Sequence, residues 1–293
     1  MIIPNEQPKS STGQPATNIV LVAGPVKEHD RVGHHDYLAG CALLADLLRR
    51  TPGISPIVIR DGWPEDETIF AKAAAIVFYD GGSGKQAFLK STARIDHIQK
   101  AVDTGIGIVM IHQTVSFPQE WTDCGKAWIG GTYVPGLSRR GHWKTHHEDF
   151  PLHPITSGVC SWNSNDGWLN HIQFVKNMHG ITPLLWSGKR QKGSRKGGDD
   201  DIVAWAYERP NGGRSFSFTG LDAHSAWFVS GLRQFVVNGI LWSAGCEVPA
   251  IGAPSEIDQR KLTGYLTPRR PKTPVILRVL RKLAARLVGH RRW

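Results

Sequence analysis

Histidine is the residue type most able to do chemistry in this sequence, which contains 13 of them. Several stand where predicted strands end: His35 follows a first strand, His112 comes directly after a fourth, and His224 follows a strand ending at Thr219. Neutral imidazole ligates metals of the zinc type, exchanges protons near an ordinary pKa of about 6.5, and hydrogen-bonds to polyols. The histidine pattern leaves these three roles open.

Other groups that could take part stand beside further histidines. An indole stacks on the apolar face of a sugar ring, so Trp143 beside His142 and Trp168 near His171 are candidate substrate contacts. The ordinary alternative is that each tryptophan fills the core. A carboxylate could orient an imidazole or act as a base, and the candidates are Asp36, Asp166 and Asp222.

Two familiar catalytic motifs are absent from the sequence. Gly81 to Lys85 is too short for a phosphate-binding loop and Gln86 follows the lysine, so we expect no nucleotide cofactor, although the run could form a backbone nest. The turn at His112 carries no Ser or Cys, so covalent catalysis is not expected there.

Strand and helix patterns alternate along the chain. Short apolar runs predict buried strands at 18–24, 56–60, 74–79 and 107–111, with helices at 38–50 and 95–102. Strands return at 182–186, 201–207 and 214–219, before a closing helix at 227–244. The alternation predicts an α/β fold with a mainly parallel sheet, whose carboxyl-end loops bring His35, His112 and His224 together. The stretch 121–168 has strand-like pieces but few helical ones, and its length predicts a long functional loop region.

The formal charge of +10 is concentrated at the C-terminal end. Residues 260–293 hold 11 of the 35 Lys and Arg residues and no Asp or Glu, which leaves 24 bases against 25 acids elsewhere. Within this tail, 274–288 has apolar and basic residues on opposite faces of a predicted helix, which favours an anionic membrane surface over nucleic acid as a partner. A solvated extension is the remaining alternative.

These patterns divide the chain into three parts. We expect a disordered polar segment at 1–17, one domain at 18–250, and a linker with the basic tail at 251–293. The four cysteines are too widely spaced for a metal or redox motif, and no signal peptide or membrane span is evident. A cytoplasmic location is expected.

Several motifs in this order resemble the ThuA-like (trehalose-utilisation) family. They are Asp61-Gly-Trp-Pro64, Ala75 to Tyr79, Ile111-His-Gln113, Gly130-Gly-Thr-Tyr133, His153-Pro-Ile-Thr-Ser-Gly158, Val203-Ala-Trp-Ala206, Gly212-Gly-Arg-Ser-Phe216 and the helix from Phe235 to Gly245. The resemblance covers about residues 18 to 250. It implies a flavodoxin-like, class I glutamine amidotransferase-like three-layer sandwich that lacks the amidotransferase cysteine.

The resemblance also implies candidate site residues. The family's recurrent histidines map onto His35, His112, His142, His171 and His224. A family motif that often reads G-H-x-H has Asp222 in place of its first histidine here, so the ligand set could differ from that of relatives.

Two functions from different classes fit these residues. The first is an enzyme that acts on a keto-sugar or disaccharide derivative as a hydrolase, lyase or isomerase, with His112, His224 and Asp222 as catalytic residues. His35, His142, Trp143, Trp168 and His171 would then bind substrate, and a divalent metal such as zinc would be held by His35, His112 and His224. The second is a non-catalytic sugar-binding or regulatory domain, and in either case a homo-oligomer remains open.

Overall fold

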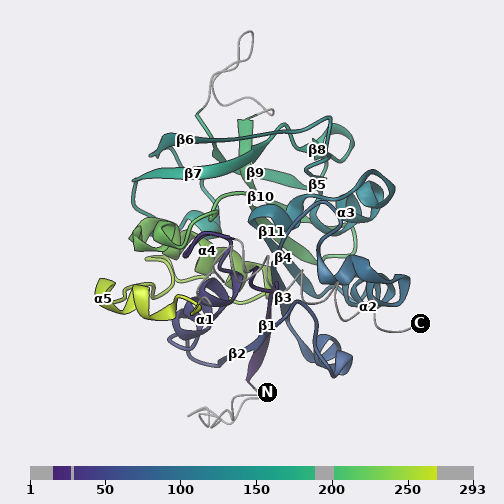
Figure 1. Ribbon diagram of the computed structural model, residues 1–293, viewed down its shortest axis with the longest axis horizontal. Helices are drawn as coiled ribbons and strands as arrows, with labels where there is room; N and C mark the ends of the chain where they lie inside the picture. Colours follow the sequence, from purple (N-terminus) through teal and green to yellow (C-terminus); the bar gives the residue numbers. More distant parts are fainter. Residues whose placement is uncertain (1–15, 28–29, 189–200, 269–293) are drawn as a thin grey trace, which may run out of the picture.

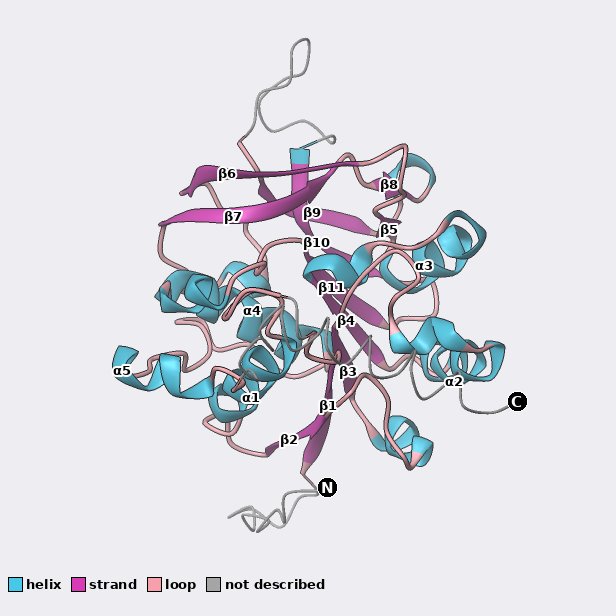
Figure 2. Ribbon diagram, viewed as in Figure 1, coloured by secondary structure: helices cyan, strands magenta, loops and turns pink. Residues whose placement is uncertain are grey.

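A computed structural model describes residues 16–27, 30–188 and 201–268 of the chain. Its centre is a seven-stranded sheet with the strand order β2-β1-β3-β4-β11-β10-β9 (Figure 1). The strands of this sheet are β1 (Thr17–Ala23), β2 (Ile54–Ile59), β3 (Ala75–Tyr79), β4 (Gly107–Ile111), β9 (Ile181–Trp186), β10 (Ile202–Glu208) and β11 (Arg214–Phe218). The strands from β2 to β11 pair in parallel, and β10 and β9 are antiparallel additions at one edge (Figure 2). The prediction of an α/β fold with a mainly parallel sheet is confirmed.

Helices cover both faces of the sheet, which makes three layers. Successive side chains of β1 point to opposite faces, so Leu21 joins one buried cluster and Val22 the other. The first face is covered by α1 (Tyr37–Leu48) and α4 (Ser230–Ser243), and the second by α2 (Thr92–Asp103) and α3 (Thr122–Ile129) (Figure 1). Burial on both faces explains why the parallel strands are continuous apolar runs in the sequence.

The stretch 121–168 is more regular than its sequence predicts. It contains α3 and two nine-residue strands, β6 (Arg139–His147) and β7 (Trp162–Asn170), which pair as an antiparallel ribbon. A further small pair joins β5 (Gly131–Thr132) to β8 (Gln173–Phe174). The strand-like pieces expected here are present as β6 and β7. The expectation of a long loop is wrong because β6 is mostly polar and alternates only weakly, so the full length of the strand is hard to recognise.

The body of the protein continues past the predicted boundary at residue 250. Residues 255–267, here called the C-terminal strap, include the short helix α5 (Gln259–Leu262) and pack against α1 and its N-terminal loop. Leu262 is fully buried, and the Tyr265 hydroxyl donates to Asp46 Oδ2 at 2.6 Å. The strap was predicted as linker because a few anchoring residues in a polar sequence give no periodic pattern.

Two hydrogen bonds fix the end of the strap. The Thr267 backbone N–H and hydroxyl both donate to the Asp36 carboxylate, at 3.0 and 2.6 Å, and Asp36 also caps the N-terminus of α1. The predicted amphipathic tail at 274–288 lies outside the described residues, as do residues 1–15 of the predicted disordered segment. Among the described helices, none has the length and apolar character that crossing a membrane requires.

Candidate metal and acid–base site

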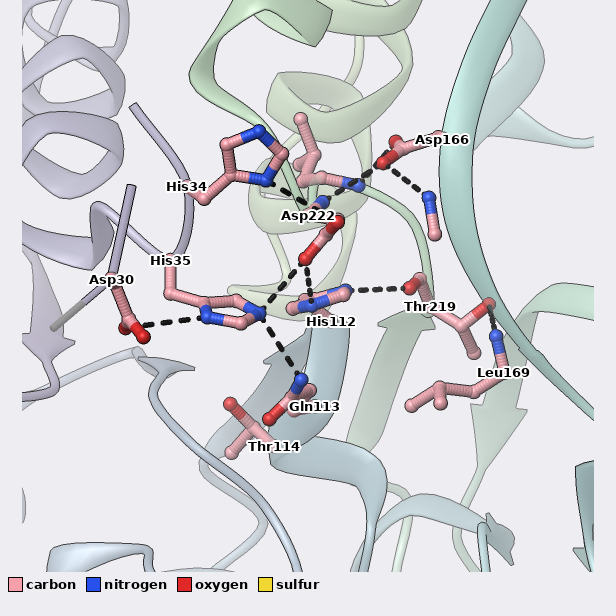
Figure 3. Close-up of polar contacts among 12 residues, drawn as sticks. Asp30, His34, His35, His112, Gln113, Thr114, Asp166, Leu169, Thr219 and Asp222 are labelled. Carbon is pink, nitrogen blue, oxygen red and sulfur yellow. Dashed lines mark hydrogen bonds and ion pairs between the residues drawn. The ribbon is translucent and has the colours of Figure 1, made fainter. Parts of the chain in front are cut away.

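Three loops at the carboxyl edge of the parallel sheet bring His35, His112 and Asp222 together (Figure 3). His35 lies in the loop after β1, His112 directly follows β4, and Asp222 lies four residues after β11. Asp222 Oδ1 is 2.8 Å from His35 Nε2 and 3.2 Å from His112 Nε2. The predicted convergence of these loops is therefore present in the structure, with a carboxylate as the third group.

The turn after β4 places the imidazole of His112. Its backbone takes a left-handed conformation, with a φ of 58°, immediately after a fully buried strand. The His112 side chain is 3% exposed and its Nδ1 lies 3.0 Å from the Thr219 carbonyl oxygen. Because a carbonyl only accepts, Nδ1 carries a hydrogen, and Nε2 faces Asp222.

His35 is oriented in the same way by a different acceptor. Its Nδ1 lies 3.3 Å from Asp30 Oδ2, so this nitrogen donates to the Asp30 carboxylate. Its Nε2 then faces Asp222 Oδ1, and the Gln113 side-chain amide, 3.2 Å away, can donate to it. Histidine ligands of metals in proteins are held in this way, with the second ring N–H on a carboxylate or a carbonyl.

Asp222 is placed by a buried carboxylate behind it. The two Asp166 oxygens accept the backbone N–H groups of Leu221 at 2.6 Å and of Asp222 at 3.0 Å. Leu221 has a φ of 72°, a strained value for a residue with a bulky side chain, and the Tyr79 hydroxyl donates to its carbonyl oxygen at 2.5 Å. Burial raises the pKa of Asp166 despite these bonds.

The pKa values within the site reflect the contact between the rings and the carboxylate. Hydrogen bonding to Asp222 raises the pKa of His35 above its ordinary value, although burial opposes the shift. Contacts with His112 and then His35 hold the pKa of Asp222 well below its usual range. If both rings are neutral, three acceptor atoms meet at one point; a proton on His35 Nε2, which would then donate to Asp222, or a metal ion there would relieve the repulsion between their lone pairs.

His224 does not join this group. Its ring is buried, and Nε2 lies 2.9 Å from the Leu262 carbonyl oxygen of the C-terminal strap, so it donates there. Burial lowers the pKa of His224. The predicted grouping of His35, His112 and His224 is therefore corrected, because His224 faces the strap and the third converging atom belongs to Asp222.

Three of the predicted substrate-binding residues, His142, Trp143 and Trp168, lie on the β6–β7 ribbon. His142 is exposed and pairs with Gly167, which lies against Asp222. Trp143 is half-buried and its indole N–H donates to the Ser187 carbonyl oxygen at 3.0 Å. Contacts of His142 and Trp143 with a sugar remain predictions.

Trp168 and His171 are the other two predicted substrate contacts in this region. Trp168 is 0% exposed and packs edge-on against Phe218, so its prediction as a stacking platform is wrong: the ring belongs to the core. His171 is half-buried at the end of β7, with a backbone φ of 57°. The structure does not bring it into the group of converging ligand atoms among the described residues.

Sequence reasoning missed several residues that complete the site. Asp30 and Gln113 contact His35, and His34 Nδ1 lies 3.6 Å from Asp222 Oδ2. Gln113 and His34 could have been found, because each is adjacent in sequence to a predicted site histidine. Asp30 had no signal of this kind, since a loop aspartate is ordinarily solvated.

The glycine run after β3 does not form the suggested anion-binding nest. Its backbone N–H groups bond within the protein: Gly81 to Asp80 Oδ1, Ser83 to the Ser116 carbonyl and Gly84 to Gln86 Oε1. These donors are therefore already used by internal acceptors.

The fold and the site define an α/β protein with a histidine–carboxylate centre in place of a nucleophile at the turn after β4. The family model described as ThuA, trehalose utilisation, matches residues 25–243. The chain belongs to this family. No functionally curated protein matches it.

Two solved ThuA-like structures share the fold at low sequence identity. A ThuA-like protein from Bacteroides uniformis is 14% identical, with 82% of this chain and 95% of that chain covered and a TM-score of 0.57. One from Parabacteroides merdae is 12% identical over 87% of this chain and 100% of that chain, with a TM-score of 0.54. A glutamine amidotransferase from Thermotoga maritima is 10% identical over 79% of this chain and 97% of that chain, with a TM-score of 0.44.

Proposed function

We propose that the chain is an enzyme acting on a keto-sugar or disaccharide derivative by metal-assisted acid–base chemistry at His35, His112 and Asp222. The observation that carries the proposal is the convergence of three acceptor atoms, with both Nδ1–H groups already donated to Asp30 and Thr219. The family's description as trehalose utilisation supports a carbohydrate as the substrate.

The donor set fits a divalent metal of the zinc type. Two imidazole nitrogens and one carboxylate oxygen are ligands that zinc takes in catalytic sites, where a fourth position stays open for water or substrate. The side chains of His35 and Asp222 are 25% and 20% exposed, which leaves an approach from solvent. When bound, such a metal would supply a Lewis acid that polarises a carbonyl or hydroxyl oxygen.

The remaining polar groups can position substrate and move a proton. With Oδ1 used as a ligand atom, Asp222 Oδ2 lies 3.6 Å from His34 Nδ1 at the edge of the site. A carbonyl acidifies the hydrogen on the adjacent carbon, so a base here could remove that hydrogen and return it to a leaving oxygen or to another carbon. Elimination of a glycosidic oxygen and isomerisation are both compatible with this arrangement.

Metal content of the whole chain, purified after growth with metal supplied, tests the site. We expect nearly one divalent ion per chain in the unaltered protein and loss of it in His112→Ala and Asp222→Ala. His147→Gln is the matched control, because His147 is also a buried histidine with an unpartnered Nε2 in the described part of the chain. Equal metal in all four proteins, or none in any, would contradict the metal centre.

Turnover of keto-glycosides tests the enzymatic part of the proposal. We expect product with the metal-loaded protein and none with folded His112→Ala. Saturable sugar binding without product at any pH or with any metal would instead establish a non-catalytic sugar-binding domain.

A further inference from the structure

A cavity of about 340 Å³ lies at the His147 end of the β6–β7 ribbon, here called the ribbon cavity. Its lining combines titratable and aromatic side chains, mainly His146, His147, Glu148, Asp149 and Trp186. Ligand pockets begin at about 300 Å³. At about 3.4 Å per residue, His147 is about 17 Å along β6 from His142, which is opposite Gly167 and Asp222. The ribbon cavity is thus separate from the histidine–carboxylate site.

His147 is a buried residue whose Nε2 has no hydrogen-bond partner among the described residues. Its side chain packs between Trp162 and Trp168, with ring centroids 4.9 and 5.6 Å away, and the residue is 4% exposed. No hydrogen bond reaches its buried Nε2 from the described residues. Burial, with a smaller effect of His146, lowers the pKa of His147 to about 4, so the ring is neutral at physiological pH. A buried polar atom left unpaired costs stability and calls for an explanation.

Trp186 adds a second unsatisfied group to the same cavity. The residue is partly exposed, yet its indole Nε1–H is buried and has no acceptor in the described part of the chain. Across the cavity lining, Glu148 and Asp149 are exposed carboxylates, and Glu148 lies 3.3 Å from His146 Nε2. The residues that line the cavity therefore include a tryptophan with a buried, unpaired N–H, a neutral histidine with a buried, unpaired Nε2, and two exposed carboxylates.

Three classes of small ligand can be compared against this lining. An anion would accept from the indole N–H but would be repelled by Glu148 and Asp149. An ammonium group would suit the carboxylates but leave the indole N–H without an acceptor, since it has only donors. A hydroxyl both donates to a carboxylate and accepts from an N–H, and the apolar face of a sugar-like ring packs on indole.

We propose that the ribbon cavity is a second binding site, for an uncharged hydroxylated ring of about monosaccharide size. Its hydroxyls donate to Glu148 and Asp149 and accept from Trp186 Nε1, while the ring lies on the indole face. The buried nitrogens of Trp186 and His147 become available when these rings turn slightly toward the cavity they line. The proposal goes beyond the function proposed above and does not depend on a metal centre.

Glucose titrations of the whole chain, followed by NMR, test the proposal directly. We expect saturable shifts of the Trp186 indole N–H and the His147 ring nitrogens. The dissociation constant, followed at His147, should rise about tenfold in Trp186→Phe, which keeps a ring but lacks the N–H, and in the double variant Glu148→Gln, Asp149→Asn. Trp121→Phe is the matched control, since Trp121 is also partly buried but does not line the cavity.

One further variant and three other ligands distinguish the ribbon cavity from the histidine–carboxylate site and from a site for another class of ligand. His112→Ala should leave the glucose affinity at the ribbon cavity unchanged, even if metal and turnover are lost, so the two proposals can fail independently. Sorbitol, choline and glucose 6-phosphate should all bind more weakly than glucose, because they lack the ring, the hydroxyl array or the neutral charge. Absence of a saturable glucose shift, equal affinities in Trp186→Phe and Trp121→Phe, or tighter binding of choline would each overturn the proposal.

Discussion

His112 and His147 are both buried imidazoles with an Nε2 that lacks a satisfying hydrogen bond among the described residues, but their surroundings differ. His112 donates through Nδ1 to Thr219 and faces the Asp222 carboxylate, which also contacts His35. His147 packs against two indole rings, and burial dominates its pKa. Burial alone makes a neutral ring, whereas burial beside oriented acceptors creates a place for a cation or a proton.

The largest expected effect comes from removing Asp166, the buried carboxylate that supports the site around His112 but not the surroundings of His147. Asp166→Ala leaves the backbone N–H groups of Leu221, Asp222 and Gly167 without their acceptor. We expect the free energy of unfolding to fall by about 3–5 kcal/mol, measured by urea denaturation, together with loss of metal binding. Asp149→Ala, an exposed carboxylate, is the control, and a loss below about 1 kcal/mol in Asp166→Ala would contradict this role.

Acid should lower the stability of the protein through His147. The pKa of His147 is about 4 in the folded protein and about 6.5 in the unfolded chain, so between these values the unfolded chain binds more protons. The contribution of His147 is complete above pH 6.5 and is lost as the pH falls to about 4, by about 3 kcal/mol.

Urea denaturation across this pH range measures that loss, and His147→Gln should remove it. His153 and His224 also have pKa values lowered by burial and remain in both proteins. The difference between the two pH profiles therefore isolates His147, and parallel profiles would show that its ring is not held neutral by burial.

Removing the Asp30 carboxylate, which orients His35, should have a smaller effect, and only on metal affinity. Asp30→Ala removes the acceptor of His35 Nδ1–H, and we expect the metal dissociation constant to rise by about 10- to 100-fold. Chelator competition measures it. Glu148→Gln, which alters the carboxylate beside His146 instead, should leave metal affinity unchanged. Equal affinities in the Asp30 variant and the unaltered protein would remove Asp30 from the site.

The smallest effect is expected from changing Tyr265, which lies outside both the His112 site and the surroundings of His147. Tyr265→Phe removes the hydrogen bond to Asp46 and should lower the free energy of unfolding by about 1 kcal/mol. Denaturation, metal titration and acid titration of the same variant form the test. A change in metal affinity, or in the loss of stability that His147 causes in acid, would mean that the strap is coupled to the His112 site or to His147.

The parallel sheet could be predicted from sequence because its strands are buried on both faces. Runs such as Ile19 to Ala23 and Ala75 to Tyr79 are apolar throughout, and each is followed by turn residues. The same pattern placed His35, His112 and His224 at carboxyl-end loops that converge in any open parallel sheet, and the first two meet there with Asp222 in place of His224. The edge of the sheet that carries the site was therefore predictable.

What could not be predicted depends on side-chain direction and on polar pairing. His224 also follows a strand of the parallel sheet, but its ring turns to the Leu262 carbonyl, a contact between residues 38 positions apart. Trp168 looks like Trp143 in sequence, yet alternation along β7 turns it into the core. The β6–β7 ribbon pairs two polar strands, whose register is set by packing that no apolar pattern records.

The strap limits where this protein can be shortened or fused. Its last described contacts hold Asp36, the residue next to His35, so an expression fragment ending at residue 250 would uncover the surface beneath Leu262 and release the start of α1. Such a fragment would report defects of its own in any metal or sugar assay. A cleavage site, an affinity tag or a swapped tail should therefore be placed after Thr267.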